Sequence, residues 1–133
     1  MTPFDIDHVG VATPSITDTR SLYELLTGAR CSEPEVLPAQ GVTVAFIGKI
    51  ELLQPLSPDS AVGRFLARRG PGLHHLAFRV DDIAASLAML EAEGMRLIDR
   101  EPRRGARGHQ VAFVHPTSTG GVLWEIVQNA TDP

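Results

Sequence analysis

The two halves of this sequence repeat one pattern, and this repeat limits the possible folds more than any other feature. Residues 6–12 read Ile-Asp-His-Val-Gly-Val-Ala and residues 73–79 read Leu-His-His-Leu-Ala-Phe-Arg, so each half has an alternating segment that contains a histidine. Each half later has an apolar segment that a glutamate interrupts, Ile50-Glu51-Leu52-Leu53 and Trp124-Glu125-Ile126-Val127. Such internal similarity predicts two copies of one supersecondary unit.

Composition narrows the class of protein. A chain of 133 residues with 43% hydrophobic and 21% charged residues is typical of one globular domain. The net charge of −4 argues against general nucleic-acid binding, and no apolar run approaches the ~18–20 residues of a membrane span. Cys31 is the single cysteine, and the N-terminal segment does not resemble a signal peptide. We expect a cytoplasmic protein that binds neither nucleic acid nor membranes.

Periodicity and turn residues predict the order β-α-β-β-β in both halves, and therefore an α+β fold. The expected strands are 5–12, 30–37, 41–47 and 49–55 in the first half and 73–80, 95–99, 109–115 and 121–128 in the second, with a loop at 100–108. Gly70-Pro71-Gly72 is the strongest break in the chain. We expect a single domain over residues 1–133, with module 1 at about 5–56, a linker helix at about 57–71 and module 2 at about 72–128.

Capping residues set the ends of the predicted helices. Ser15 can cap a first helix that Gly28 ends, and Asp81 and Asp82 can start another that Gly94 ends. The apolar side of the first helix is expected to consist of Leu22, Tyr23, Leu25 and Leu26.

The histidines and glutamates of the repeat form a candidate metal site. Strand alternation places His75 on one face and His74 on the other, towards a helix-covered core. A carboxylate in the middle of an apolar strand is costly to bury unless it is paired or bound to a cation. Two imidazoles and two carboxylates suit one divalent ion, which could be cobalt, nickel, manganese or zinc. The expected ligands are His8, Glu51, His75 and Glu125.

Arginines gather in two stretches of an otherwise acidic chain. These groups contain Arg64, Arg68 and Arg69 in the first half and Arg103, Arg104 and Arg107 in the second. Guanidinium groups bind phosphates well, so an anion site is one interpretation. The other is an ordinary solvated surface.

Several segments give the chain a family resemblance. They read Asp-His-Val-Gly-Val-Ala (7–12), Gln-Gly-Val-Thr-Val-Ala-Phe (40–46), Ile-Glu-Leu-Leu-Gln-Pro-Leu-Ser-Pro-Asp-Ser (50–60), Gly-Leu-His-His-Leu-Ala-Phe-Arg-Val-Asp-Asp-Ile (72–83), Glu-Pro-Arg-Arg-Gly (101–105) and His-Pro-Thr-Ser-Thr-Gly-Gly-Val-Leu-Trp-Glu (115–125). In these segments the chain resembles the vicinal oxygen chelate superfamily, which includes glyoxalases and bleomycin-resistance proteins. Within it, the chain is most similar to the methylmalonyl-CoA epimerases.

The resemblance implies a structure and a reaction. It implies two βαβββ modules in tandem, whose curved mixed sheets surround a metal held by the four residues named above, and a homodimer. It implies an isomerase that interconverts (2R)- and (2S)-methylmalonyl-CoA, an acyl-CoA thioester, by removing and returning a proton at C2. The arginine groups become candidates for binding the coenzyme A phosphates, and Ser118, Thr119 and Gly120 for other substrate contacts.

One position departs from the family pattern. Some epimerases have a further glutamate, thought to be a catalytic base, where this chain has Val44, and some have glutamine in place of Glu51. Either a metal-bound carboxylate therefore also acts as the catalytic base, for which Glu125 and Glu51 are the expected residues, or another group transfers the proton.

Two alternatives remain at this stage. A glyoxalase I-type lyase, or another metal-dependent enzyme of the superfamily, would use the same ligands. A non-catalytic protein that binds small molecules would need an aromatic-rich cavity, which an aromatic content of 5% does not favour.

Overall fold

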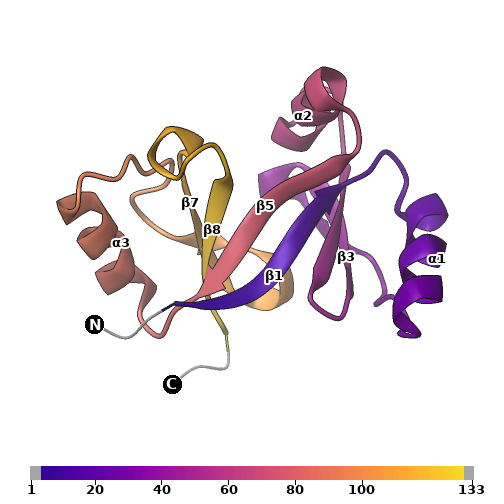
Figure 1. The fold of residues 1–133 in the computed structure, drawn as a ribbon, viewed down its shortest axis with the longest axis horizontal. Helices are drawn as coiled ribbons and strands as arrows, with labels where there is room; N and C mark the ends of the chain where they lie inside the picture. Colours follow the sequence, from indigo (N-terminus) through magenta and orange to yellow (C-terminus); the bar gives the residue numbers. More distant parts are fainter. Residues whose placement is uncertain (1–3, 131–133) are drawn as a thin grey trace. The chain divides into compact units, whose positions relative to one another are not determined.

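The chain folds in the predicted element order. The computed structural model describes residues 4–130, which contain eight strands and three α-helices. They are β1 (Asp5–Ala12), α1 (Ile16–Thr27), β2 (Glu35–Leu37), β3 (Val42–Ile47), β4 (Ile50–Pro55), α2 (Ala61–Arg69), β5 (Gly72–Arg79), α3 (Ile83–Ala92), β6 (Arg103–Arg104), β7 (Gln110–Val114) and β8 (Leu123–Gln128) (Figure 1). The α+β class and the two βαβββ modules are confirmed.

Contacts divide the chain into two compact units. Unit 1 consists of Met1–His8 and His75–Pro133, of which 4–8 and 75–130 are described, and unit 2 is Val9–His74. The strand order is β2-β3-β4-β1 in the first half and β5-β8-β7-β6 in the second. The pairs β1–β4 and β5–β8 are parallel, and the other strand pairs within each half are antiparallel. Each half therefore contains both parallel and antiparallel strands.

In unit 2, α1 packs against β3 and β4 through a narrow face. Its inward residues are Ile16, which is buried, and Tyr23, which packs against the same core cluster. These residues are seven apart, or about two helical turns, so they lie on one side of the helix. The expectation that Leu22, Leu25 and Leu26 pack inward is wrong, because they lie away from this line and are 65%, 85% and 77% exposed.

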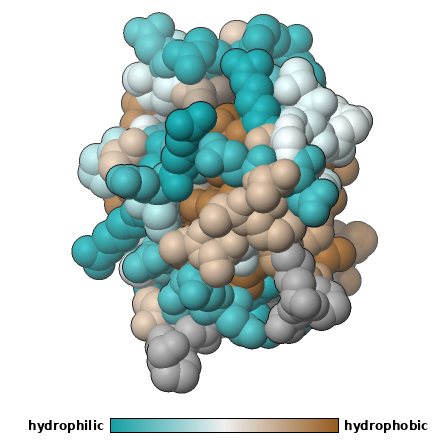
Figure 2. Space-filling view, turned by 90° about the vertical axis from the view of Figure 1, so that its left-hand side faces the viewer, coloured by the Kyte–Doolittle hydropathy of each residue, from teal (hydrophilic) through white to brown (hydrophobic). Residues whose placement is uncertain are grey.

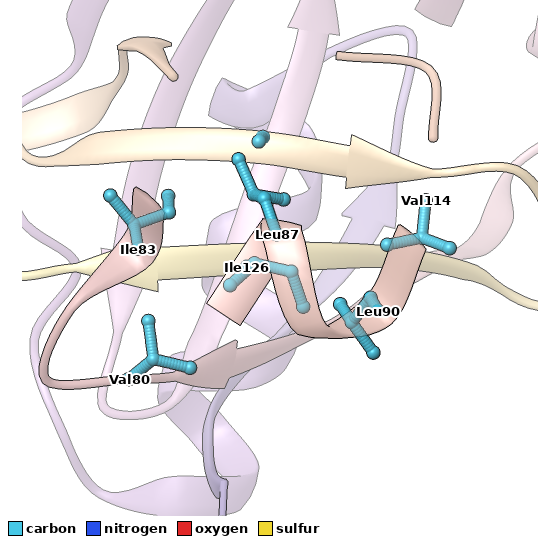
Figure 3. Packing of buried hydrophobic residues seen from close by; sticks show 7 residues of the cluster. Val80, Ile83, Leu87, Leu90, Val114 and Ile126 are labelled. Atoms are coloured by element: carbon cyan, nitrogen blue, oxygen red, sulfur yellow. The ribbon is translucent and has the colours of Figure 1, made fainter. Parts of the chain in front are cut away.

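In unit 1, α3 covers its strands with regularly spaced apolar side chains. Ile83, Leu87 and Leu90 recur at intervals of four and three residues and are all buried. Figure 3 shows them against Val114 and Ile126, with Val80 at the same cluster. Burial of a leucine or isoleucine side chain stabilises a fold by about 1.5–3 kcal/mol, so this cluster holds the helix on its sheet.

Two predicted segments in the second half differ from the structure. Residues 95–99 form no continuous strand but a single bridge, Leu97 to Val114. The predicted loop contains the short strand β6, which pairs with β7 instead. The carboxylate of Asp99 accepts the Phe113 N–H at 2.9 Å, so a side chain takes a bond that a strand would have made.

Both sheet-covering helices begin in the same way. Ser15 caps α1 and Asp82 caps α3, as predicted. In addition, the Ile16 N–H donates to Oε1 of Gln54 at 2.8 Å, and the Ile83 N–H donates to Oε1 of Gln128 at 2.9 Å. Each glutamine lies three residues after the repeat glutamate of its strand. The repeat therefore extends to how each helix is joined to its sheet.

The surface on the α3 side is mixed in polarity. Ala84, Ala85 and Ala88 are outward residues of this helix. Figure 2 views the molecule from the side on which α3 lies in Figure 1, and shows teal polar side chains interspersed with pale brown ones. Over residues 4–130, no helix combines the length and the apolar character needed to span a membrane.

Candidate metal centre

Strand register places the two repeat glutamates in equivalent positions. In unit 2, Glu51 on β4 lies opposite Gly10 on β1, two residues after His8. In unit 1, Glu125 on β8 lies opposite Ala77 on β5, two residues after His75. The equivalence expected from the sequence therefore holds in the backbone pairing.

The four expected ligands are all buried, at 4–6% exposure, and each offers one atom that can bind a metal ion. Three of them meet within unit 1. Nε2 of His8 lies 3.3 Å from Nε2 of His75, and Oε1 of Glu125 lies 3.0 Å from the first nitrogen and 3.2 Å from the second. Glu51 belongs to unit 2.

The spacing of these atoms fits a bound ion. A metal–ligand distance of about 2.1 Å at roughly tetrahedral to octahedral angles separates neighbouring ligand atoms by roughly 3.0–3.4 Å. All three measured separations lie in that range. Oε1 of Glu125 is also a buried oxygen that makes no hydrogen bond of acceptable geometry within the described residues. Buried polar atoms seldom remain in this state, so a cation is a good partner for it.

Electrostatics keep Glu125 ionised. Burial raises the pKa of its carboxyl group, but the adjacent rings of His75 and His8 outweigh burial and lower the pKa to about 2. The carboxylate is therefore the charged form that a metal ligand requires.

Asp7 is a part of the site that strand alternation did not reveal. Its Oδ2 lies 2.7 Å from Nδ1 of His8, although neighbouring residues of a strand usually point to opposite faces. The hydrogen bond to His8 lowers the pKa of Asp7, with smaller contributions from the charges of His8, Arg79 and His109, and partial burial opposes them. The only sequence signal was an acidic residue directly before the histidine.

Phe113 and Arg103 extend the site along unit 1. Phe113 lies directly opposite Glu125 in the β7–β8 pair, so their side chains share a face. Its ring meets the His75 ring edge-on, with centroids 6.0 Å apart. The guanidinium of Arg103 lies 5.4 Å from the Phe113 ring centre and pairs with Asp99 at 3.3 Å.

In unit 2, an apolar residue occupies the position at which some epimerases have a further glutamate. Val44 is 1% exposed and lies opposite Leu53, while Phe46 lies opposite Glu51. Alternation puts Val44 and Phe46 on the same face of β3. A glutamate at this position would share a face with Glu51, and here no titratable group replaces it.

Comparison with known proteins now gives the family. A family model described as the glyoxalase/bleomycin resistance protein/dioxygenase superfamily matches residues 7–113. The chain belongs to this superfamily. It is 41% identical to a mitochondrial methylmalonyl-CoA epimerase of Dictyostelium discoideum, over 91% of this chain and 76% of that protein. It is 37% identical to an ethylmalonyl-CoA/methylmalonyl-CoA epimerase of Cereibacter sphaeroides, over 92% of this chain and 96% of that one.

A solved structure is also similar to this chain in fold and sequence. A variant of the Streptomyces coelicolor methylmalonyl-CoA epimerase, in complex with 2-nitronate-propionyl-CoA, superposes with a TM-score of 0.94 at 36% identity and covers 98% of both chains. The resemblance stated from the sequence motifs is confirmed.

The other candidates from the sequence are residues outside the four expected ligands. His74 is half-buried and packs edge-on against Phe65 of α2, with centroids 4.9 Å apart, as its predicted helix-facing position requires. Ser118 and Thr119 have hydroxyl groups that are engaged by the backbone, because Ser118 Oγ accepts the Arg96 N–H and Thr119 Oγ1 donates to Val122 O. Gly120 follows with a φ of 77°.

The six candidate arginines are exposed and divide between the units. On α2, Arg64 donates to Asp59 O at 2.6 Å, and Arg69 lies 5.6 Å from the Phe65 ring centre. Arg68 is in the last turn of the same helix. Arg103 and Arg104 form β6, and Arg107 follows in a turn with a φ of 58°.

Proposed function

We propose that this chain is an isomerase that interconverts (2R)- and (2S)-methylmalonyl-CoA. One observation carries the proposal: two imidazole nitrogens and one carboxylate oxygen lie within 3.3 Å of one another at a buried position in unit 1. The relatives of the chain include methylmalonyl-CoA epimerases. The C2 proton of this substrate lies next to a thioester carbonyl and is only weakly acidic. The reaction therefore needs a positive charge near the carbonyl oxygen and a base near the proton.

The proposed ligands are His8, His75 and Glu125, with Glu51 as the fourth. Glu51 is supported by its register, which is equivalent to that of Glu125, and by its buried carboxylate, which offers an atom that can bind a metal ion. A divalent ion bound here would supply Lewis-acid stabilisation of the enolate oxygen that forms on deprotonation. The nitrogen and oxygen ligands suit cobalt, nickel, manganese or zinc.

We assign proton transfer at C2 to Glu125 and Glu51. One carboxylate takes the proton from one face of the carbon, and the other returns a proton to the opposite face. Val44 provides no alternative group on the unit 2 strand where some epimerases have a glutamate. Phe113 lies directly opposite Glu125, and an apolar ring at this position would limit the access of water and so strengthen electrostatic interactions there.

Coenzyme A binding is assigned to the arginines. Charged guanidinium groups on α2 and at β6 offer forks for phosphate oxygens, and Ser118, Thr119 and Gly120 form a turn that can approach the thioester arm. Remote phosphate contacts stabilise the substrate and transition state about equally. Replacing a contributing arginine by alanine should thus raise KM and leave kcat almost unchanged. If KM is unchanged in all six variants, the assignment is wrong.

A direct assay tests the function. Purified protein loaded with Co²⁺ should exchange the C2 proton of methylmalonyl-CoA with deuterium from heavy water and produce both stereoisomers. A hemithioacetal of methylglyoxal should remain unchanged, and turnover of it instead would favour the glyoxalase I-type alternative. Absence of any bound metal after purification and loading would favour a non-catalytic binding protein.

We further propose a cytoplasmic homodimer. Cys31 is buried and free, which agrees with a reducing compartment. The exposed Leu22, Leu25 and Leu26 of α1 form an apolar surface that a second copy can cover.

A further inference from the structure

We infer that Asp7 is a positioning residue whose carboxylate holds the His8 ring in the tautomer that turns its Nε2 lone pair towards Glu125 and His75. The inference deepens the proposed function, because it concerns how one proposed metal ligand is prepared. Its starting point is the 2.7 Å contact between Asp7 Oδ2 and His8 Nδ1.

The direction of this hydrogen bond follows from the chemistry of the two groups. An ionised carboxylate has no proton to donate, so a hydrogen bond to Asp7 requires the hydrogen on Nδ1 of His8. Glu125 Oε1 also lies near this ring, at Nε2, but it makes no hydrogen bond of acceptable geometry there, whereas Asp7 does at Nδ1. In the neutral ring the lone pair then belongs to Nε2. That nitrogen is the atom that lies 3.0 Å from Glu125 Oε1 and 3.3 Å from His75 Nε2. The ring is thus oriented at one nitrogen by Asp7 and available at the other for a metal.

The contact is specific to this half of the chain. The position before His75 in the repeat is His74, and its ring packs against Phe65 on α2. Asp7 instead reaches the ring of its own neighbour, and its side chain is 25% exposed while that of His8 is 7% exposed. Repetition of the fold does not explain an acidic residue here, whereas orientation of a buried histidine does.

Carboxylates that hold a metal-binding histidine typically change metal affinity by 10–100-fold when they are removed. We therefore expect Asp7→Ala to weaken Co²⁺ or Zn²⁺ binding 10- to 100-fold, measured by competition with a chromophoric chelator. Asp7→Asn should lose less, because its amide oxygen can still accept the Nδ1 hydrogen. Asp5→Asn is the matched control, since Asp5 is an exposed residue two positions earlier on β1, and its metal affinity should stay within about twofold of the wild type.

A second measurement reports the tautomer without metal. In metal-free protein labelled with ¹⁵N-histidine at alkaline pH, the wild-type His8 ring should show a protonated Nδ1 and an unprotonated Nε2. Asp7→Ala should shift His8 towards the opposite tautomer, while Asp5→Asn should not. Thermal unfolding of each variant verifies that the fold is retained.

The two readouts separate the possible failures. Wild-type metal affinity and an unchanged His8 tautomer in Asp7→Ala would overturn the positioning role while leaving the metal proposal intact. If the wild type binds no metal, the metal proposal fails, and the tautomer measurement still decides whether Asp7 orients His8.

Discussion

At the scale of single residues, neighbouring histidines on β5 have different environments. His75 is 4% exposed and lies beside Glu125, whereas His74 packs on the Phe65 ring. We predict that His75→Ala reduces metal content from one ion per chain to none, because it removes a ligand. His74→Ala should retain the metal and lose about 1 kcal/mol of stability from the lost ring contact. Metal analysis and urea unfolding measure both effects, and unchanged stoichiometry in His75→Ala would refute the ligand assignment.

The carboxylates can be tested in the same way. Glu125→Gln and Glu51→Gln each keep an oxygen ligand and remove the basic group. We predict that metal remains bound while deuterium exchange at C2 falls roughly 100-fold or more, the usual size of a general acid–base effect. Exchange should be followed separately from each stereoisomer, because each base serves one face of C2. Wild-type exchange in both variants would mean that another group is the base.

The repeat in the sequence predicted much of this site. The two histidines and two glutamates were found from repeat position, and each proved buried. Asp7 and the position of Arg103 over Phe113 were not predicted. Both depend on where a flexible side chain turns, which strand alternation does not specify.

At the scale of elements, a glutamine at the end of each fourth strand joins the sheet to its helix. Gln54 and Gln128 accept the first N–H groups of α1 and α3, which have no partner within their own helices. We predict that Gln54→Ala and Gln128→Ala each cost about 1–2 kcal/mol of unfolding free energy. Gln110→Ala provides the control, because Gln110 is an exposed residue on β7. Equal losses in all three variants would show that the helix contacts contribute nothing.

Predictions at this scale succeeded where local chemistry decides the structure. Ser15 with Gly28 at α1, and Asp82 at α3, act as expected because capping depends on nearby backbone atoms. The predicted strand at 95–99 is reduced to one bridge with β7, because the side chain of Asp99, and not a backbone carbonyl, accepts the Phe113 N–H. The prediction that the α1 leucines pack inward was wrong, because an apolar stripe in the sequence does not reveal which surface will cover it.

At the scale of the whole molecule, the exposed leucines of α1 suggest an assembly. We predict that Leu25→Glu converts a dimer to a monomer, since it places a charge at the centre of the proposed contact. Sedimentation equilibrium measures the mass. Leu73→Glu is the control, because Leu73 lies on β5 and is 74% exposed, compared with 85% for Leu25. A wild-type monomer, or a Leu25→Glu dimer as stable as the wild type, would exclude this surface.

The sequence by itself determined the modules, the helix caps and the four candidate ligands, because these depend on periodicity and on a repeat that can be aligned by eye. Tertiary structure decided which atoms meet. It brought Nε2 of His8 and His75 to Oε1 of Glu125, turned Asp7 onto His8 and left Leu25 in solvent. These outcomes depend on contacts between residues far apart in the chain and on side-chain rotamers, and neither is encoded in local spacing.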